Sequence, residues 1–382
     1  MILLEGSVIW DATRLSAGDG PRMELTDLVR FKDAWYCGFR EGQAHENHPS
    51  GRARIIRSAD GMRWESVALF GWDGADVREP RFSVTAEGSL MVNTALAFVS
   101  QRPRADGRYY QLDDPRGTGG DREPDVSYQS VTWLSRDGRN WSSAYTCPSG
   151  INTWRWETHW HNGMGYSVGY AGKDVKGTLY RTRDGRNWRA LKEGFFGGCP
   201  GNEASFAFGS DDTAYCLVRD AVLRARTDLR GSDGHEIAAG QTRKVHGDGL
   251  PALGIGKAPY YQQWEWKSLR ADYGPEYGGA RPCAALFSAP LGGPKLLRLS
   301  DGRLLAVGRM LGPDRDDGRI TVFRVDPDAG LLTCLAECDG TTYGGIAEHD
   351  GMVWVSFVGK ACHRGDWAVR LARVDLNCER EV

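Results

Sequence analysis

The sequence predicts an all-β fold, and three features support this: the composition, a turn motif that recurs three times, and further turns spaced along the chain. The 382 residues include 50 glycines, 14 tryptophans, 14 tyrosines and 12 phenylalanines. Aromatic residues favour strands, and glycine favours the tight turns between strands. All-β chains of this length often form one domain, so we expect residues 1–382 to be a single domain.

The turn motif has the pattern Ser/Thr-x-Asp-Gly-x-x-Trp and occurs at residues 58–64, 135–141 and 182–188. A strand-like segment precedes each copy. We therefore expect a hairpin turn in which the glycine adopts positive φ and the aspartate accepts hydrogen bonds from the turn's own amides. The tryptophan should pack back on the hairpin. A pattern repeated in this way is typical of repeat architectures.

Further turns of the Asp-Gly kind divide the chain into six units. We expect each unit to be a four-stranded antiparallel blade and the six blades to form a β-propeller. A strand at residues 7–10 should join the last blade and close the ring, which removes exposed sheet edges. Two inserts, at about 101–126 and 226–258, are expected to be surface loops. The predicted blades span about 24–67, 76–145, 153–191, 202–269, 292–335 and 341–382.

Charge and hydropathy exclude several classes of partner. The formal net charge is -2 and no long run of one sign occurs, so neither nucleic acid nor a membrane is an expected partner. No stretch approaches the roughly 18 apolar residues of a membrane span, and the chain reaches Glu5 without a signal-peptide core, so we expect a cytoplasmic protein. The nine cysteines are scattered without paired C-x-x-C spacing, so no zinc site, other metal or cofactor is expected.

Polar residues recur where the innermost strand of each predicted blade begins. In a propeller these strands line the central channel, so their first residues converge from distant parts of the chain. Buried polar groups are costly unless they are paired or solvated, which favours a functional channel over a dry one. The residues concerned are Asp27, Arg78, Glu79, Trp156, Glu157, His159, Glu203, Lys295 and Tyr343.

The repeated turn resembles the Asp-box, or BNR repeat, of sialidase-like proteins, and the channel residues follow an order similar to that family's. The resemblance implies a six-bladed propeller with a tyrosine nucleophile activated by a glutamate, an acid/base aspartate, and three arginines that bind a substrate carboxylate. Glu203 and Arg219 look like the glutamate and second arginine, Arg309 like the third arginine, and Tyr343 like the nucleophile. The alternative is that Glu203 pairs with an arginine and Tyr343 packs structurally.

The first predicted blade departs from the family pattern. Thr26-Asp27-Leu28 stands where sialidases have Arg-Ile-Pro, so the first arginine is missing, and whether Arg40 or Arg78 replaces it is open. The sequence is then as compatible with a neutral sugar substrate, or with an acidic sugar bound in another way, as with sialic acid. Arg40 and Glu41 are equally compatible with an ordinary ion pair. Trp156 and His159 are further candidates for substrate contact, and the candidates for the general acid are Asp27, Glu41, His45 and Glu79.

We therefore expect a glycoside hydrolase of sialidase-like architecture that cleaves a terminal sugar from a small-molecule or oligosaccharide substrate. One alternative is a carboxylate pair, such as Asp27 with Glu79 or Glu203, that acts on a neutral glycoside. Another is a propeller that binds carbohydrate without catalysis, because a fold alone does not fix function. A Tyr343 hydroxyl beyond hydrogen-bond reach of Glu203 would favour binding alone.

Overall fold

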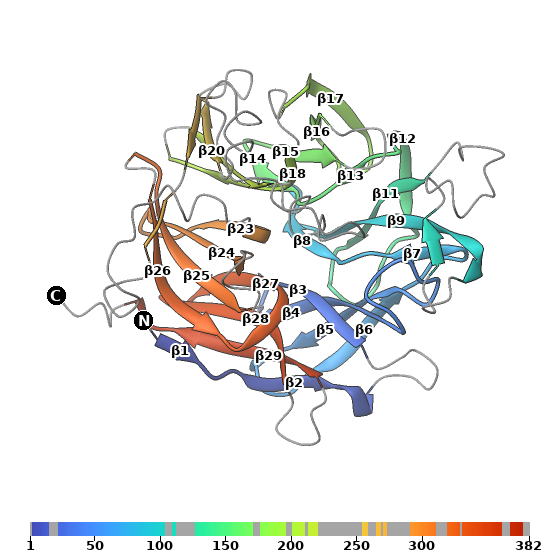
Figure 1. Ribbon diagram of the computed structural model, residues 1–382, viewed down its shortest axis with the longest axis horizontal. Coiled ribbons are helices and arrows are strands. Elements are labelled where there is room, and N and C mark those ends of the chain that lie inside the picture. Colours follow the sequence, from blue (N-terminus) through green and yellow to red (C-terminus); the bar gives the residue numbers. More distant parts are fainter. Residues whose placement is uncertain are drawn as a thin grey trace, which may run out of the picture.

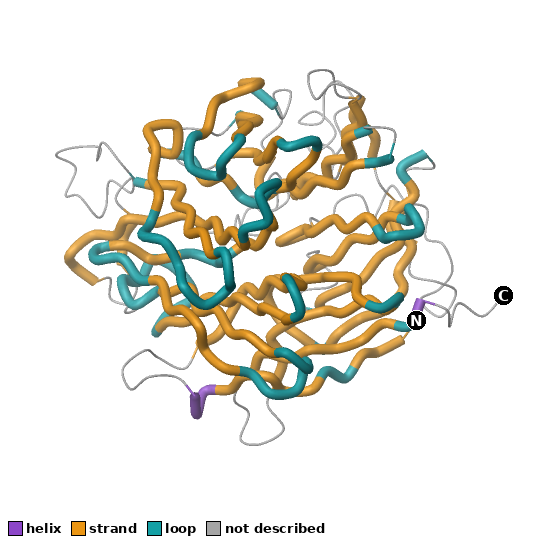
Figure 2. Tube along the Cα trace, turned by 180° about the vertical axis from the view of Figure 1, so that it is seen from behind, coloured by secondary structure: helices purple, strands orange, loops and turns teal. Residues whose placement is uncertain are grey.

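The computed structural model describes residues 2–14, 22–103, 109–111, 127–170, 176–195, 201–210, 213–220, 254–258, 265–268, 270–272, 291–310, 319–328, 331–360 and 367–376. Within these ranges the strands form six sheets set around a common centre, which makes the chain an all-β propeller (Figure 1). Figure 2 shows the same ring from behind. Most of both predicted inserts lies outside the described residues.

Three of the six sheets have four strands each. In each of them the strands pair in antiparallel order, as the sequence predicts for a blade. The first consists of β3 (Arg22–Phe31), β4 (Ala34–Gly42), β5 (Arg52–Ser58) and β6 (Glu65–Phe70). The second consists of β18 (Gly201–Phe208), β19 (Ala214–Asp220), β20 (Gly254–Ala258) and β21 (Glu265–Ser268), and the third of β27 (Gly340–His349), β28 (Met352–Lys360), β29 (Trp367–Val374) and β2 (Ser7–Asp11).

The other three sheets have five or six strands, so the prediction of four strands per blade is wrong for them. One contains β7 (Ala75–Val77), β8 (Arg81–Val84), β9 (Leu90–Pro103), β10 (Tyr109–Gln111), β11 (Tyr128–Ser135) and β12 (Tyr145–Ile151). Another contains β13 (Trp154–Arg155), β14 (His159–His161), β15 (Met164–Tyr170), β16 (Thr178–Thr182) and β17 (Trp188–Glu193). The last contains β23 (Leu291–Arg298), β24 (Leu304–Met310), β25 (Ile320–Asp326), β26 (Leu331–Cys338), β1 (Ile2–Leu4) and β22 (Arg270–Asp272).

Two of these larger sheets gain a strand because their innermost strand is broken. β7 and β8 both pair with β9, and the break between them contains Glu79 and Pro80. β13 and β14 both pair with β15, and their break contains Trp156 and Glu157. Proline has no amide hydrogen to donate to a sheet, which explains the first break. Both breaks release polar or aromatic residues from strand pairing beside the central channel.

The start of the chain joins two neighbouring sheets. β1 pairs in parallel with β26, and β2 pairs antiparallel with β29. Arg370 Nη1 also donates to the carbonyl of Gly6, between these two strands, at 2.7 Å. The core lies between adjacent sheets: Leu28, Cys37 and Phe39, for example, pack in one buried cluster with Leu371. No described helix is long and apolar enough to cross a membrane.

The three repeated turns have the predicted geometry. Gly61, Gly138 and Gly185 have φ of +75°, +73° and +72°. In each copy the glycine amide donates to the Ser or Thr hydroxyl, and the aspartate accepts two amides that follow it. The indoles of Trp64 and Trp188 donate to the carbonyl of their turn glycine at 3.0 and 3.1 Å. These contacts confirm the predicted turn.

Replacing Asp184 with alanine is expected to destabilise the fold by about 1–2 kcal/mol, because the amides of Arg186 and Asn187 lose their acceptor. Burial alone would raise the pKa of Asp184, but these hydrogen bonds outweigh it and lower the pKa. Its contribution is therefore present above the ordinary pKa of the carboxyl and is lost as the pH falls through the lowered value. Urea unfolding at pH 7 and pH 3 should show a smaller difference between variant and wild type at pH 3. An equal difference at both pH values would contradict this role.

Candidate active site

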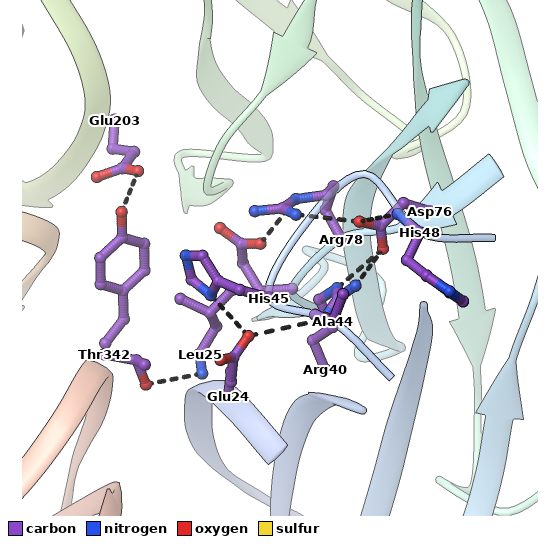
Figure 3. A network of polar contacts seen from close by, with 12 residues as sticks. Glu24, Leu25, Arg40, Ala44, His45, His48, Asp76, Arg78, Glu203 and Thr342 are labelled. Atoms are coloured by element: carbon purple, nitrogen blue, oxygen red, sulfur yellow. Dashed lines mark hydrogen bonds and ion pairs between the residues drawn. The ribbon is translucent and has the colours of Figure 1, made fainter. Parts of the chain in front are cut away.

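Tyr343, Glu203 and Arg219 lie together at the centre of the ring. The Tyr343 hydroxyl donates to Glu203 Oε1 at 2.7 Å (Figure 3). Arg219 Nη1 donates to both oxygens of Glu203, at 2.8 and 2.9 Å, and also to the Tyr343 hydroxyl. The three residues come from β27, β18 and β19, so residues 124 and 140 positions apart in the sequence share one hydrogen-bonded cluster.

The surroundings of this cluster set its protonation. Burial raises the pKa of Tyr343, and the charges of Glu203 and Glu79 add to this against the opposing charge of Arg219. Burial alone would also raise the pKa of Glu203, but the charge of Arg219 and the hydrogen bonds that Glu203 accepts outweigh it and lower its pKa. At neutral pH the proton therefore rests on the phenol, which donates a hydrogen bond to the ionised carboxylate of Glu203.

The backbone of Gly293 completes the cluster. Its amide donates to Glu203 Oε2 at 2.8 Å, and its φ is +58°. A Cβ atom at this position would lie 2.0 Å from Tyr343 Cγ. The tyrosine ring therefore packs directly on the backbone of β23, a contact that only glycine permits. Sequence reasoning placed residues 293–295 at a strand entry but assigned Gly293 no part in the site.

Two non-glycine residues with positive φ flank the cluster. Leu25 has φ of +62° and Thr342 has φ of +71°, which is an unusual conformation for a β-branched residue. The amide of Leu25 donates to Thr342 Oγ1 at 3.0 Å. Backbone strain of this kind persists where surrounding structure enforces it, and it gathers at functional sites. The contact also ties β3, which carries Glu24, to the strand that carries Tyr343.

Asp27 and Glu41, two candidates for the general acid, have no exposed surface. Asp27 accepts the amides of Leu28 and Phe82 at 2.8 and 2.7 Å and pairs with Lys295 Nζ. Glu41 forms a two-point ion pair with the Arg54 guanidinium rather than with Arg40. These partners contact both carboxylate oxygens of each residue, and the acid role of Asp27 and Glu41 stays a prediction.

Lys295 joins Asp27 to Glu157, whose Oε1 lies 3.3 Å from Lys295 Nζ. Replacing Lys295 with methionine should therefore destabilise the fold by about 3 kcal/mol, because two buried carboxylates lose their counter-charge. Replacing Arg303 with methionine is the control: its ion pair with Asp301 is exposed, and such pairs contribute about 1 kcal/mol or less. Urea unfolding at pH 7 measures both. Equal, small losses for the two variants would show that the buried network is not electrostatically coupled.

Neither Arg40 nor Arg78 is placed to replace the missing first arginine. Arg40 is fully buried, and its Nε and Nη2 atoms each lie 2.8 Å from Asp76 Oδ1. Arg78 Nη1 lies 3.2 Å from Asp76 Oδ2, and Arg78 Nε lies 3.5 Å from Glu79 Oε2. Figure 3 shows that Arg40 and Arg78 both reach Asp76. Both guanidinium groups are thus committed to protein carboxylates.

Glu79 and His45 remain as candidates for the general acid. Burial raises the pKa of Glu79, and the charge of Glu203 adds to this against the opposing charges of Arg78 and Arg81. His45 instead has a half-exposed side chain, and its Nδ1 atom lies 2.8 Å from Glu24 Oε2. Burial alone would raise the pKa of Glu24, but the hydrogen bond and charge of His45 and the charges of Arg40 and Arg22 lower it to about 2.

The remaining residues predicted to contact substrate mostly pack against or pair with other protein side chains. Trp156 is fully buried, and its ring meets the Tyr343 ring edge-on at 5.7 Å, so Trp156 supports the tyrosine rather than presenting a face to a sugar. His159 Nε2 lies 3.1 Å from Glu157 Oε2. Arg309 pairs with Gly292 in the ladder between β23 and β24, next to Gly293, and is partly buried.

Sequence reasoning missed Arg81. This residue is fully buried, and its guanidinium lies 4.1 Å from the centre of the Trp156 ring. Among the described residues, none of its side-chain nitrogens has a hydrogen-bond partner. The signal available was its place after Pro80 at an innermost strand. In the part of the chain that the structure describes, no group of three His, Cys, Asp or Glu residues is arranged to hold a metal ion.

Comparison with known proteins gives structural likeness only. No protein-family model and no curated protein matches the chain. Solved structures do match, over nearly the whole chain. The chain shares their propeller fold. A protein of unknown function from Dyadobacter fermentans aligns over 97% of this chain and 98% of its own, with a TM-score of 0.59 and 15% identity.

Several of the matching structures are glycosidases. An α-L-arabinofuranosidase from Fusarium graminearum in complex with an iminosugar inhibitor aligns over 99% of both chains, with a TM-score of 0.56 and 10% identity. A Hadza microbial sialidase aligns over 97% of this chain and 68% of its own, with a TM-score of 0.61 and 14% identity. At these identities the likeness establishes the fold and leaves the activity to the site residues.

Proposed function

We propose that the protein is a single six-bladed propeller of the sialidase-like, Asp-box kind and a glycoside hydrolase that cleaves a terminal sugar. The observation that carries the proposal is the hydrogen bond of 2.7 Å between the Tyr343 hydroxyl and Glu203, with Arg219 bound to both. A propeller that only binds carbohydrate needs no such pair. The shared fold with an arabinofuranosidase and a sialidase supports the reaction class by analogy.

In the proposed reaction the Tyr343 oxygen attacks the anomeric carbon while its proton passes to Glu203. The bond from that carbon to the leaving oxygen breaks, and a covalent glycosyl-tyrosine forms. Arg219 touches both partners, so it can stabilise negative charge as it moves from the carboxylate toward the phenol oxygen. Water then hydrolyses the intermediate, and the proton on Glu203 returns to the phenolate.

The number of arginines available to bind substrate indicates whether the preferred sugar carries a carboxylate. Arg40 and Arg78 are held by Asp76, so the predicted substrate-binding arginines left are Arg309 and Arg219, the latter itself bonded to Glu203. Two arginines hold a substrate carboxylate less firmly than three. We therefore expect a sialoside not to be the best substrate.

A second candidate function is a carboxylate-pair glycosidase that uses Glu79 and Glu203 on a neutral sugar. Its support is that the surroundings shift the two carboxyls in opposite directions, raising the pKa of Glu79 and lowering that of Glu203. Such a divergence is typical of an acid and its partner base or nucleophile. In this alternative Tyr343 only orients Glu203.

A screen against aryl glycosides, including a sialoside and an arabinofuranoside, tests the proposal. We expect turnover of at least one member, and loss of that turnover in Tyr343→Phe. A Tyr343→Phe variant that keeps its activity while Glu203→Gln loses it would favour the carboxylate pair. Binding of the glycosides without turnover by the wild type would reject the enzyme and leave a binding module.

A further inference from the structure

We propose that His45, held by Glu24, is the general acid and base of the reaction, in the place where a carboxylic acid is expected. This inference rests on the proposed glycosidase function and identifies a positioning residue, Glu24, that sequence reasoning did not single out. It also chooses among four candidate acids.

Glu24 is anchored from several sides on β3. Its side chain is 5% exposed, and Oε1 accepts hydrogen bonds from Arg22, at 3.0 Å from Nε and 2.9 Å from Nη2. Oε2 faces His45 Nδ1 at 2.8 Å and Arg40 Nη1 at 3.6 Å. A fixed carboxylate beside Nδ1 keeps the proton on that nitrogen, so the Nε2 atom is left to exchange a proton with substrate.

The backbone around His45 is fixed as well. Arg40 Nη1 donates to the carbonyl of Ala44, the residue before His45, at 2.7 Å. Arg40 itself is held by the buried carboxylate of Asp76. One arginine therefore positions both the histidine's backbone and the carboxylate that orients its ring.

His45 is connected to the nucleophile through Glu24 and the contact between β3 and β27. Glu24 precedes Leu25, whose amide bonds to Thr342, and Tyr343 follows Thr342. Figure 3 shows the ring of His45 between the Glu203 side of the site and the Asp76–Arg78 pair. The side chain is 43% exposed, so a leaving group that enters from solvent can reach it. A general acid must come within about 2.6–3.2 Å of the leaving oxygen.

The other three candidates lack this combination. Asp27 and Glu41 are fully buried, and their oxygens are occupied by Lys295, Arg54 and backbone amides. Glu79 is 1% exposed and lies beside Arg78. His45 alone among the four has both a partly exposed side chain and a buried carboxylate that orients it.

Over the two steps of the reaction, His45, Glu203 and Tyr343 each return to their starting protonation state. In the first step protonated His45 gives its Nε2 proton to the glycosidic oxygen as the bond to the anomeric carbon breaks, while Glu203 takes the Tyr343 proton. In the second step neutral His45 takes a proton from water as the water oxygen attacks the anomeric carbon. Tyr343 leaves as a phenolate and recovers its proton from Glu203, which restores the starting state.

The dependence of kcat/KM on the leaving group of the substrate tests whether His45 is the general acid. Loss of the general acid lowers the cleavage rate most for glycosides with poor leaving groups, because good leaving groups depart without being protonated. For His45→Gln and Glu24→Gln we expect kcat/KM to fall by about 10²–10⁴ for an alkyl or unsubstituted phenyl glycoside, and by less than about 10-fold for a dinitrophenyl glycoside. The matched control is His48→Gln, because His48 lies in the same segment and contacts Ser50. In this variant we expect the ratio of kcat/KM between the two glycosides to be that of the wild type.

A second measurement is independent of turnover. In ¹⁵N-labelled protein the neutral His45 ring should carry its proton on Nδ1, and Glu24→Gln should shift it toward Nε2. A wild-type ring protonated on Nε2, or leaving-group dependence in Glu79→Gln but not in His45→Gln, would overturn the inference. If the wild type hydrolyses no glycoside, the proposed function fails even where the Nδ1 proton is found, so the two failures are distinguishable.

Discussion

Replacing Tyr343 with phenylalanine is expected to lower kcat/KM by about 10⁴-fold, which corresponds to roughly 5.5 kcal/mol of transition-state stabilisation. The variant keeps the ring that packs on Gly293 and Trp156 but removes the oxygen that donates to Glu203 and accepts from Arg219. The fold should therefore be retained while the nucleophile is lost. Steady-state rates on the best aryl glycoside of the panel, together with the melting temperature, measure the two effects separately.

The control for this variant is Tyr166→Phe, which removes a phenol from β15 in the same protein. Tyr166 lies in a sheet that does not contribute the nucleophile cluster, so its activity should stay within about 3-fold of the wild type. A covalent glycosyl-enzyme trapped on the wild type and absent from Tyr343→Phe would identify the nucleophile directly. Retention of more than a tenth of the activity by Tyr343→Phe would reject a tyrosine nucleophile.

Replacing Gly293 with alanine is expected to lower activity by about 10³-fold and to destabilise the fold. The new Cβ would lie 2.0 Å from Tyr343 Cγ, so the ring and its hydroxyl must move away from Glu203. Displacement of about 1 Å at a reacting group costs roughly 10²-fold or more in rate. The amide that bonds Glu203 would shift too, and alanine at φ of +58° costs a further 1–2 kcal/mol, to order of magnitude.

Gly351→Ala separates backbone strain from displacement of the tyrosine. Gly351 has φ of +70°, and a Cβ there would meet no atom within 4 Å. Both variants should lose comparable stability through the backbone, but Gly351→Ala should keep its activity. Urea unfolding and kcat/KM measured on both proteins decide the point, and equal activity in the two would show that Gly293 does not position Tyr343.

The propeller was predictable because its signals are local. The residues that make up each repeated turn, or each Asp-Gly pair, are close together in the sequence, so each turn can be recognised without knowing the fold. The breaks of the innermost strands are different, because a break is decided by what the neighbouring strand offers for pairing. Pro80 was a signal for the first break, whereas residues 156–158 give no comparable signal for the second.

The resemblance to sialidase-like proteins implied the cluster of Glu203, Arg219 and Tyr343, and the structure brings these three together. The acid could not be predicted in the same way. Whether a carboxylate is free depends on partners that are remote in sequence, such as Lys295 for Asp27, which lies 268 positions away. Glu24 gave no signal because it sits inside a strand beside apolar residues.

The pairing of β2 with β29 has a consequence for biosynthesis. Gly6 and Arg370, which are bonded beside that pairing, are separated by 364 positions, so ring closure must await translation of the chain past Arg370. Until then the growing polypeptide exposes unpaired strand edges, which are templates for association with other chains. Native contacts of such long range also slow folding. We therefore expect the yield of active protein in cells to depend on chaperone supply more strongly than its final stability suggests.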